Sequence, residues 1–82
     1  MRRNPILEAK LAGRRAIGAW LTVGSTFTAE TMARAGLDCI TIDLQHGSVG
    51  WADLGPIIQV IDGAGSCAVV RVPWNEIGRA HV

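Results

Sequence analysis

Residues 43 to 46 read Asp-Leu-Gln-His, and they come directly after the short apolar run Cys-Ile-Thr-Ile. An imidazole such as that of His46 is the side chain best suited to proton transfer near neutral pH, and a carboxylate such as Asp43 can fix its tautomer. Arg71 ends another apolar run and offers a planar fork of donors for a carboxylate or an oxyanion. The set favours proton abstraction next to a carbonyl, with the enolate held by a cation.

The same residues also have structural interpretations, and spacing alone leaves both readings open. Asp43 can cap the turn that follows it, and His46 can be an ordinary hydrogen-bonded loop histidine. Arg71 can be the partner in a structural ion pair, and Trp20 can be a packing residue. The sequence contains no glycine-rich phosphate loop, no CxxC pair and no HExxH helix motif.

Three apolar runs predict the strands that position these side chains. We expect strands over residues 16–22, 39–43 and 67–72, each bounded by charged residues, glycine or proline. Their carboxyl ends lie about 21 and 28 residues apart, which suits a helix crossing between parallel strands. The polar candidates fall at these carboxyl ends, with Trp74 and Asn75 just beyond the third strand.

Cap and stop residues predict three helices. Asn4 followed by proline predicts the start of the first helix, whose apolar side is formed by Ile6, Leu7 and Leu11. Glycines end the helices at positions 13, 36 and 63 to 65.

The second and third helices can be located by their first turns. Ser25 or Thr26 caps the second helix, and Glu30 is expected in its first turn, where a carboxylate favours the helix dipole. The third helix should begin close to Asp53, since Pro56 is tolerated only near a helix start, where the amides lack partners.

The alternation of helices and strands predicts an α/β fold with a parallel sheet. Three parallel strands leave two edges exposed and too little helix cover, so the chain looks like the beginning of a larger object. Eight such units form a (β/α)8 TIM barrel, and this chain holds about two and a half of them, ending after strand 3. The working face of that fold is the carboxyl end of the strands.

Composition excludes several classes of partner. The 82 residues are 49% hydrophobic and 18% charged with a net charge of +1, so no strong field attracts nucleic acid or a membrane surface. Cys39 and Cys67 lie inside apolar runs without metal-site spacing. No stretch approaches the roughly 18 apolar residues of a membrane span, and the N-terminus lacks a signal peptide pattern. We expect a reduced, cytoplasmic protein.

An ordered series of motifs resembles the HpcH/HpaI class II pyruvate aldolases, which are metal-dependent lyases built on a β/α barrel. The resemblance covers nearly all of residues 4 to 76. The matching segments are Asn4, Leu11-Ala12-Gly13, GAWL at 18 to 21, Ala29-Glu30, Ala35-Gly36-Leu37-Asp38, IDLQHG at 42 to 47 and VVRVPWN at 69 to 75.

This resemblance implies roles for five residues. His46 would relay a proton during aldol cleavage or addition, and Asp43 would orient it. Arg71 would grip the 2-oxo acid and stabilise the pyruvate enolate, and Trp20 would line the pocket. Gln45 would also contact the substrate, at a place where family members commonly carry glutamate.

The resemblance also implies what lies outside this chain. The family holds a divalent metal such as Mg²⁺, Mn²⁺ or Co²⁺ with a glutamate and an aspartate from later strands, so no metal ligand is assigned here. We expect residues 1–76 to be the N-terminal part of the barrel and the chain by itself to be inactive. The complete enzyme would act on a 2-oxo acid and an aldehyde, as a homo-oligomer.

Alternatives remain for the tail and for the function. Residues 77–82 resemble the translation of a common sequencing adapter, which predicts a non-native tail, although an ordinary short tail is the other interpretation. The chain can also be a complete, non-enzymatic α/β binding module, or part of a different TIM-barrel lyase acting on 2-oxo acids. A cooperative thermal melt of the purified chain favours the binding module.

Overall fold

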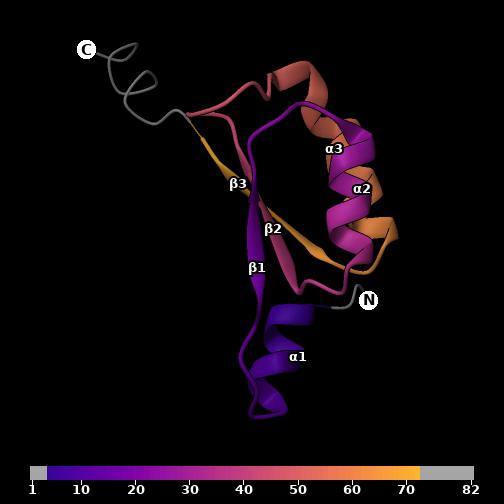
Figure 1. The fold of residues 1–82 in the computed structure, drawn as a ribbon. Helices are drawn as coiled ribbons and strands as arrows, with labels where there is room; N and C mark the ends of the chain where they lie inside the picture. Colours follow the sequence, from indigo (N-terminus) through magenta and orange to yellow (C-terminus); the bar gives the residue numbers. More distant parts are fainter. Residues whose placement is uncertain (1–3, 73–82) are drawn as a thin grey trace, which may run out of the picture.

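The computed structural model describes residues 4–72 and contains one parallel sheet flanked by helices. The strands, in the sheet order β1-β2-β3, are β1 (Gly18–Leu21), β2 (Cys39–Asp43) and β3 (Cys67–Arg71). The helices are α1 (Pro5–Leu11), α2 (Thr26–Arg34) and α3 (Trp51–Gly63). This confirms the predicted alternation and the parallel sheet (Figure 1). Trp74, Asn75 and the tail at 77–82 lie outside the described residues.

The hydrophobic core lies between the sheet and the α2–α3 pair, which covers one face of the sheet (Figure 1). Side chains alternate between the two faces of a strand, so Ile40 and Ile42 of β2 point toward these helices and are fully buried. They pack in one cluster with Ile57 and Ile61 of α3. Burying a side chain of this size contributes roughly 1.5–3 kcal/mol.

No helix of residues 4–72 covers the opposite face of the sheet, which is called the open face below. Trp20 on β1 is 55% exposed and Val69 on β3 is 39% exposed, although both are large apolar side chains in strands. A parallel sheet is normally covered on both faces. The helix α1 does not cover this face, because it lies near the amino end of β1 (Figure 1).

The predicted helix caps and stops are confirmed. The Asn4 side chain accepts hydrogen bonds from the amides of Ile6 and Leu7, at 3.1 and 3.2 Å. Ser25 caps α2 by accepting from the amide of Thr28 at 3.2 Å. A glycine with positive φ follows each helix end, at positions 13, 36 and 65.

One prediction about a helix start is wrong, and another holds to within two residues. Glu30 is the fifth residue of α2, beyond the first turn, and it pairs with Arg34 at 2.8 Å. The α3 helix begins at Trp51, two residues before Asp53. The Asp53 carboxylate reaches back to the amide of Gly50 at 2.9 Å, and this contact stabilises the earlier start with Pro56 inside the helix.

The ends of two strands and the buried side of α1 also differ from the prediction. The first strand is limited to Gly18–Leu21, shorter than 16–22, and the third ends at Arg71. The apolar side of α1 is largely exposed, with Leu11 78% accessible, whereas Pro5 and Ala9 are the buried residues. Every residue of β1 and β3 has a register partner on β2, so the two outer strands extend only as far as their pairing with β2.

Candidate functional site

The carboxyl ends of the three strands bring the predicted site residues to one edge of the sheet. Asp43 is the register partner of Arg71 on the neighbouring strand β3. Trp20 is the partner of Thr41, which lies two residues before Asp43 and therefore on the same face. Trp20, Asp43 and Arg71 thus share the open face, opposite the helices.

Asp43 and Arg71 form a bidentate ion pair. The Arg71 Nε donates to Oδ1 of Asp43 at 3.1 Å, and Nη2 donates to Oδ2 at 2.7 Å. Asp43 is only 3% exposed. The hydrogen bond from Arg71 lowers the pKa of Asp43 to about 2, with the backbone amides of His46 and Gln45 acting in the same direction against the effect of burial. The carboxylate is therefore held ionised.

The indole ring of Trp20 lies against the guanidinium of Arg71. The guanidinium carbon of Arg71 is 4.8 Å from the ring centroid, which is a cation–π contact across the open face. Within residues 4–72, Nε and Nη2 of Arg71 donate to Asp43, and Nη1 donates to no residue. Asp43 and Trp20 thus fix the orientation of the Arg71 guanidinium.

Asp43 also holds the backbone of the loop that follows β2. Its Oδ1 accepts hydrogen bonds from the amides of Gln45 and His46, at 2.9 and 3.0 Å. Within residues 4–72, the hydrogen bonds of Asp43 reach Arg71 and these two amides, and the imidazole of His46 is not among its partners. Asp43 therefore contacts His46 through the backbone, and the Gln45 and His46 side chains are exposed.

Sequence reasoning missed a contact between the loop after β2 and the loop after β1. The Thr22 carbonyl accepts the amide of Ser48 at 2.7 Å, across 26 residues of sequence. The only signal in the sequence was Gly47, directly after His46, because a glycine there permits a backbone conformation closed to other residues.

The described residues do not form a metal centre by themselves. Among residues 4–72, no group of three His, Cys, Asp or Glu side chains lies close enough together to hold an ion. Both oxygens of Asp43 are already engaged by Arg71. The residues present therefore do not fit a divalent metal without ligands from elsewhere.

Among residues 4–72, none of the helices has the length and hydrophobicity that a membrane span requires.

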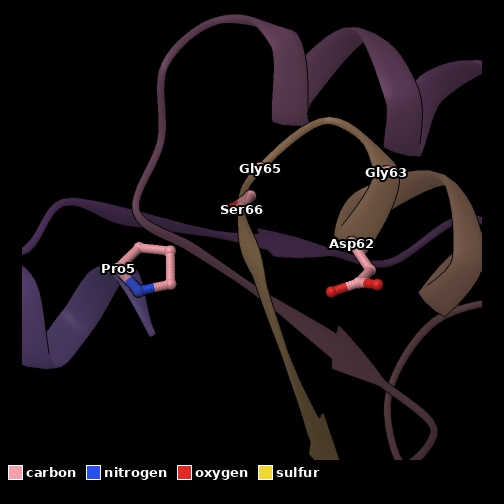
Figure 2. A pocket seen from close by; sticks show the side chains of 5 residues that line it. All are labelled: Pro5, Asp62, Gly63, Gly65 and Ser66. Atoms are coloured by element: carbon pink, nitrogen blue, oxygen red, sulfur yellow. The ribbon is translucent and has the colours of Figure 1, made fainter. Parts of the chain in front are cut away.

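A cavity of about 250 Å³ lies at the opposite end of the strands, between the start of α1 and the turn before β3 (Figure 2). Its lining residues are Pro5, Asp62, Gly63, Gly65 and Ser66. None of the predicted site residues contributes to it. The candidate site is therefore the strand-end cluster of Trp20, Asp43, His46 and Arg71.

Comparisons with known proteins find aldolases among the proteins that are similar to this chain. The hydroxypyruvate/pyruvate aldolase of Sagittula stellata is 36% identical over 74 residues, which are 90% of this chain and 29% of that protein. The 2-dehydro-3,6-dideoxy-6-sulfogluconate aldolase of Pseudomonas putida is 37% identical over 60 residues, covering 73% of this chain and 24% of that protein. The 4-hydroxy-2-oxo-heptane-1,7-dioate aldolase of Salmonella dublin is 35% identical over 74 residues, which are 90% of this chain and 28% of that protein.

The structural comparison agrees with these relatives. The crystal structure of the HpcH/HpaI aldolase from Desulfitobacterium hafniense matches with a TM-score of 0.70 and 26% identity, over 83% of this chain and 27% of that one. No protein-family profile matches the chain. In these comparisons, the chain spans less than a third of the length of the curated relatives it matches.

Proposed function

We propose that this chain, whose homologues are HpcH/HpaI-type aldolases, supplies the first units of a (β/α)8 barrel aldolase. The complete enzyme would form or split 4-hydroxy-2-oxo acids, using pyruvate or a related 2-oxo acid and an aldehyde. Residues 1–76 would be the barrel segment and 77–82 a non-native tail. The observation that carries the proposal is the strand-end cluster, in which Trp20 and Asp43 hold Arg71 beside the His46 loop.

Arg71 would bind the 2-oxo acid. Its guanidinium is fixed by two hydrogen bonds to Asp43 and by the ring of Trp20, so little rotamer freedom is lost when a carboxylate or an enolate oxygen approaches Nη1. The guanidinium would also present hydrogen-bond donors at the place where negative charge develops during enolate formation. Gln45, exposed at the same edge, would contact the remainder of the substrate.

His46 would move the protons. In the cleavage direction its imidazole takes the proton of the 4-hydroxyl group, the bond between C3 and C4 breaks, and the aldehyde leaves. The electron pair of the broken bond becomes the pyruvate enolate, which Arg71 stabilises. The imidazolium then returns the proton to C3 and pyruvate forms. Asp43 supports this step by fixing the His46 backbone through the bond to its amide.

The complete enzyme would use a divalent cation, Mg²⁺, Mn²⁺ or Co²⁺, whose ligands come from strands absent here. Such an ion supplies Lewis acidity to the 2-oxo group when bound. We also expect a homo-oligomer in the cytoplasm that binds neither nucleic acid nor membranes, in keeping with the net charge of +1.

The test requires a completed barrel, in which residues 1–76 are joined to the remaining strands of a curated relative. Replacing His46→Ala in the completed barrel is expected to lower retro-aldol turnover by about 100-fold or more, as for loss of a general base. Gln59→Ala, at an exposed position of α3, is the control and should leave turnover unchanged. Unchanged turnover in His46→Ala would remove the role assigned to the imidazole.

A further inference from the structure

The two loops at the carboxyl ends of β1 and β2 are joined through the backbone. The Thr22 carbonyl, one residue beyond β1, accepts the amide of Ser48 at 2.7 Å and the Ser48 hydroxyl at 3.4 Å. Ser48 lies two residues after His46. The loop that carries the imidazole is therefore attached to the end of the strand that carries Trp20.

Gly47 is what allows the loops to approach this closely. Its φ is +113°, a conformation that side-chain-bearing residues rarely adopt. A Cβ atom at this position would lie 2.4 Å from the Thr22 carbonyl oxygen and 2.9 Å from the Thr22 Cβ. The nearest obstacle is backbone, which no side-chain rotation can move away. Any other residue must separate the two loops.

His46 is consequently anchored on both sides. Its own amide donates to Asp43 at 3.0 Å, and Asp43 is bound to Arg71 at 2.7 Å. On its other side, Gly47 and Ser48 lie against Thr22. These contacts connect the ends of all three strands through one short segment, and they set where the imidazole lies relative to the guanidinium.

We propose that Gly47 is a positioning residue for His46, acting by close contact with the Thr22 carbonyl. The inference rests on the proposed function for its catalytic readout, and on the loop geometry for its structural one. A Cβ at position 47 would shift the imidazole while leaving the clamp of Asp43 and Trp20 on Arg71 in place. Proton transfer should therefore suffer more than binding of the 2-oxo acid.

The chain offers a matched control for the backbone strain. Gly36 also has positive φ, +92°, but a Cβ there would meet nothing within 4 Å, and it lies at the opposite end of the strands, after α2. Gly36→Ala therefore reproduces the strain without the collision. Ser48→Pro is a second variant, because its ring puts a carbon in place of the amide hydrogen that binds Thr22, and so separates the two loops without adding an atom at position 47.

In the completed barrel, Gly47→Ala and Ser48→Pro are each expected to lower kcat by about 10- to 100-fold, the size of effect produced by a misplacement of about 1 Å. KM for the 2-oxo acid should stay within about twofold, since these variants leave in place the Arg71 side chain that is proposed to bind it. Gly36→Ala should lose thermal stability but keep kcat. Unchanged kcat in both loop variants, or an equal loss in Gly36→Ala, would overturn the proposal.

A structural readout separates this proposal from the proposed function. If the unsubstituted completed barrel shows no turnover, the aldolase assignment fails, and amide hydrogen exchange of Ser48 becomes the test. Gly47→Ala should speed that exchange and shift the NMR signals of the His46 imidazole, whereas Gly36→Ala should do neither. Unchanged exchange and unchanged imidazole signals in Gly47→Ala would refute the positioning role even without an active enzyme.

Discussion

Asp43 connects the other two residues that are expected to take part in the chemistry, Arg71 and His46. Its carboxylate binds the side chain of Arg71 and the amide of His46. Truncating it would release both and leave a half-exposed cation with one fewer partner. Trp20 would then be the remaining contact that orients the guanidinium.

The ionisation of Asp43 gives a prediction for stability against pH. Its pKa falls from 3.8 to about 2, so the folded protein binds the proton more weakly than the unfolded chain. The stabilisation is complete above pH 3.8 and is lost as the pH falls through about 2. In urea unfolding of the completed barrel, the stability difference between the parent and Asp43→Asn should shrink from pH 5 toward pH 2. A difference independent of pH would contradict it.

At the scale of elements, the sequence was sufficient where a local pattern decides the outcome. The apolar run of β2 and the stops at Gly13 and Gly36 depend on nearby residues alone, and they were predicted correctly. The start of α3 was predicted to within two residues, because the Asp53 side chain binds the amide of Gly50 and so stabilises a start that places Pro56 beyond the first turn.

The pairing of Asp43 with Arg71 was likewise beyond the reach of sequence reasoning, which allowed Arg71 a structural ion pair but named no partner for it. His46 lies three residues away and invited a local pairing, whereas Arg71 lies 28 residues away and becomes a neighbour only through the strand register. Register is set by which apolar residues of β2 and β3 face the helices, and a single sequence does not state it. The contact of Thr22 with Ser48 is invisible for the same reason.

The packing of α3 on the sheet gives a prediction for the helices. Ile57 is fully buried in the core, so Ile57→Ala in the completed barrel should lower the free energy of unfolding by about 2–5 kcal/mol. Phe27→Ala, at a side chain that is 78% exposed, should change it by no more than about 0.5 kcal/mol. Urea denaturation measures both. Equal effects would mean that α2 and α3 do not pack as described.

At the scale of the whole molecule, the described segment has an open sheet face and two strands with only one neighbour each. In the order β1-β2-β3, the outer edges of β1 and β3 have no neighbouring strand among residues 4–72. Trp20 and Val69 stand exposed on the open face. A closed barrel removes such edges and turns this face into its interior.

This geometry predicts how the 82-residue chain behaves alone. With unpaired edges and an uncovered apolar face, it should aggregate and melt without a sharp transition, whereas the completed barrel should melt cooperatively. Light scattering and circular dichroism during heating measure the two properties. A monomeric 82-residue chain with a cooperative melt would instead favour the small α/β binding module.

The three strand ends are proposed to form one site that removes a proton from the carbon next to the carbonyl of a 2-oxo acid. The most direct test is the exchange of the pyruvate methyl protons for deuterium in D₂O, because it needs no knowledge of the aldehyde. In the completed barrel with Mn²⁺ present, NMR should show exchange that His46→Ala slows by about 100-fold or more. Exchange that proceeds equally fast in His46→Ala, or is absent from the unsubstituted protein, would contradict the account.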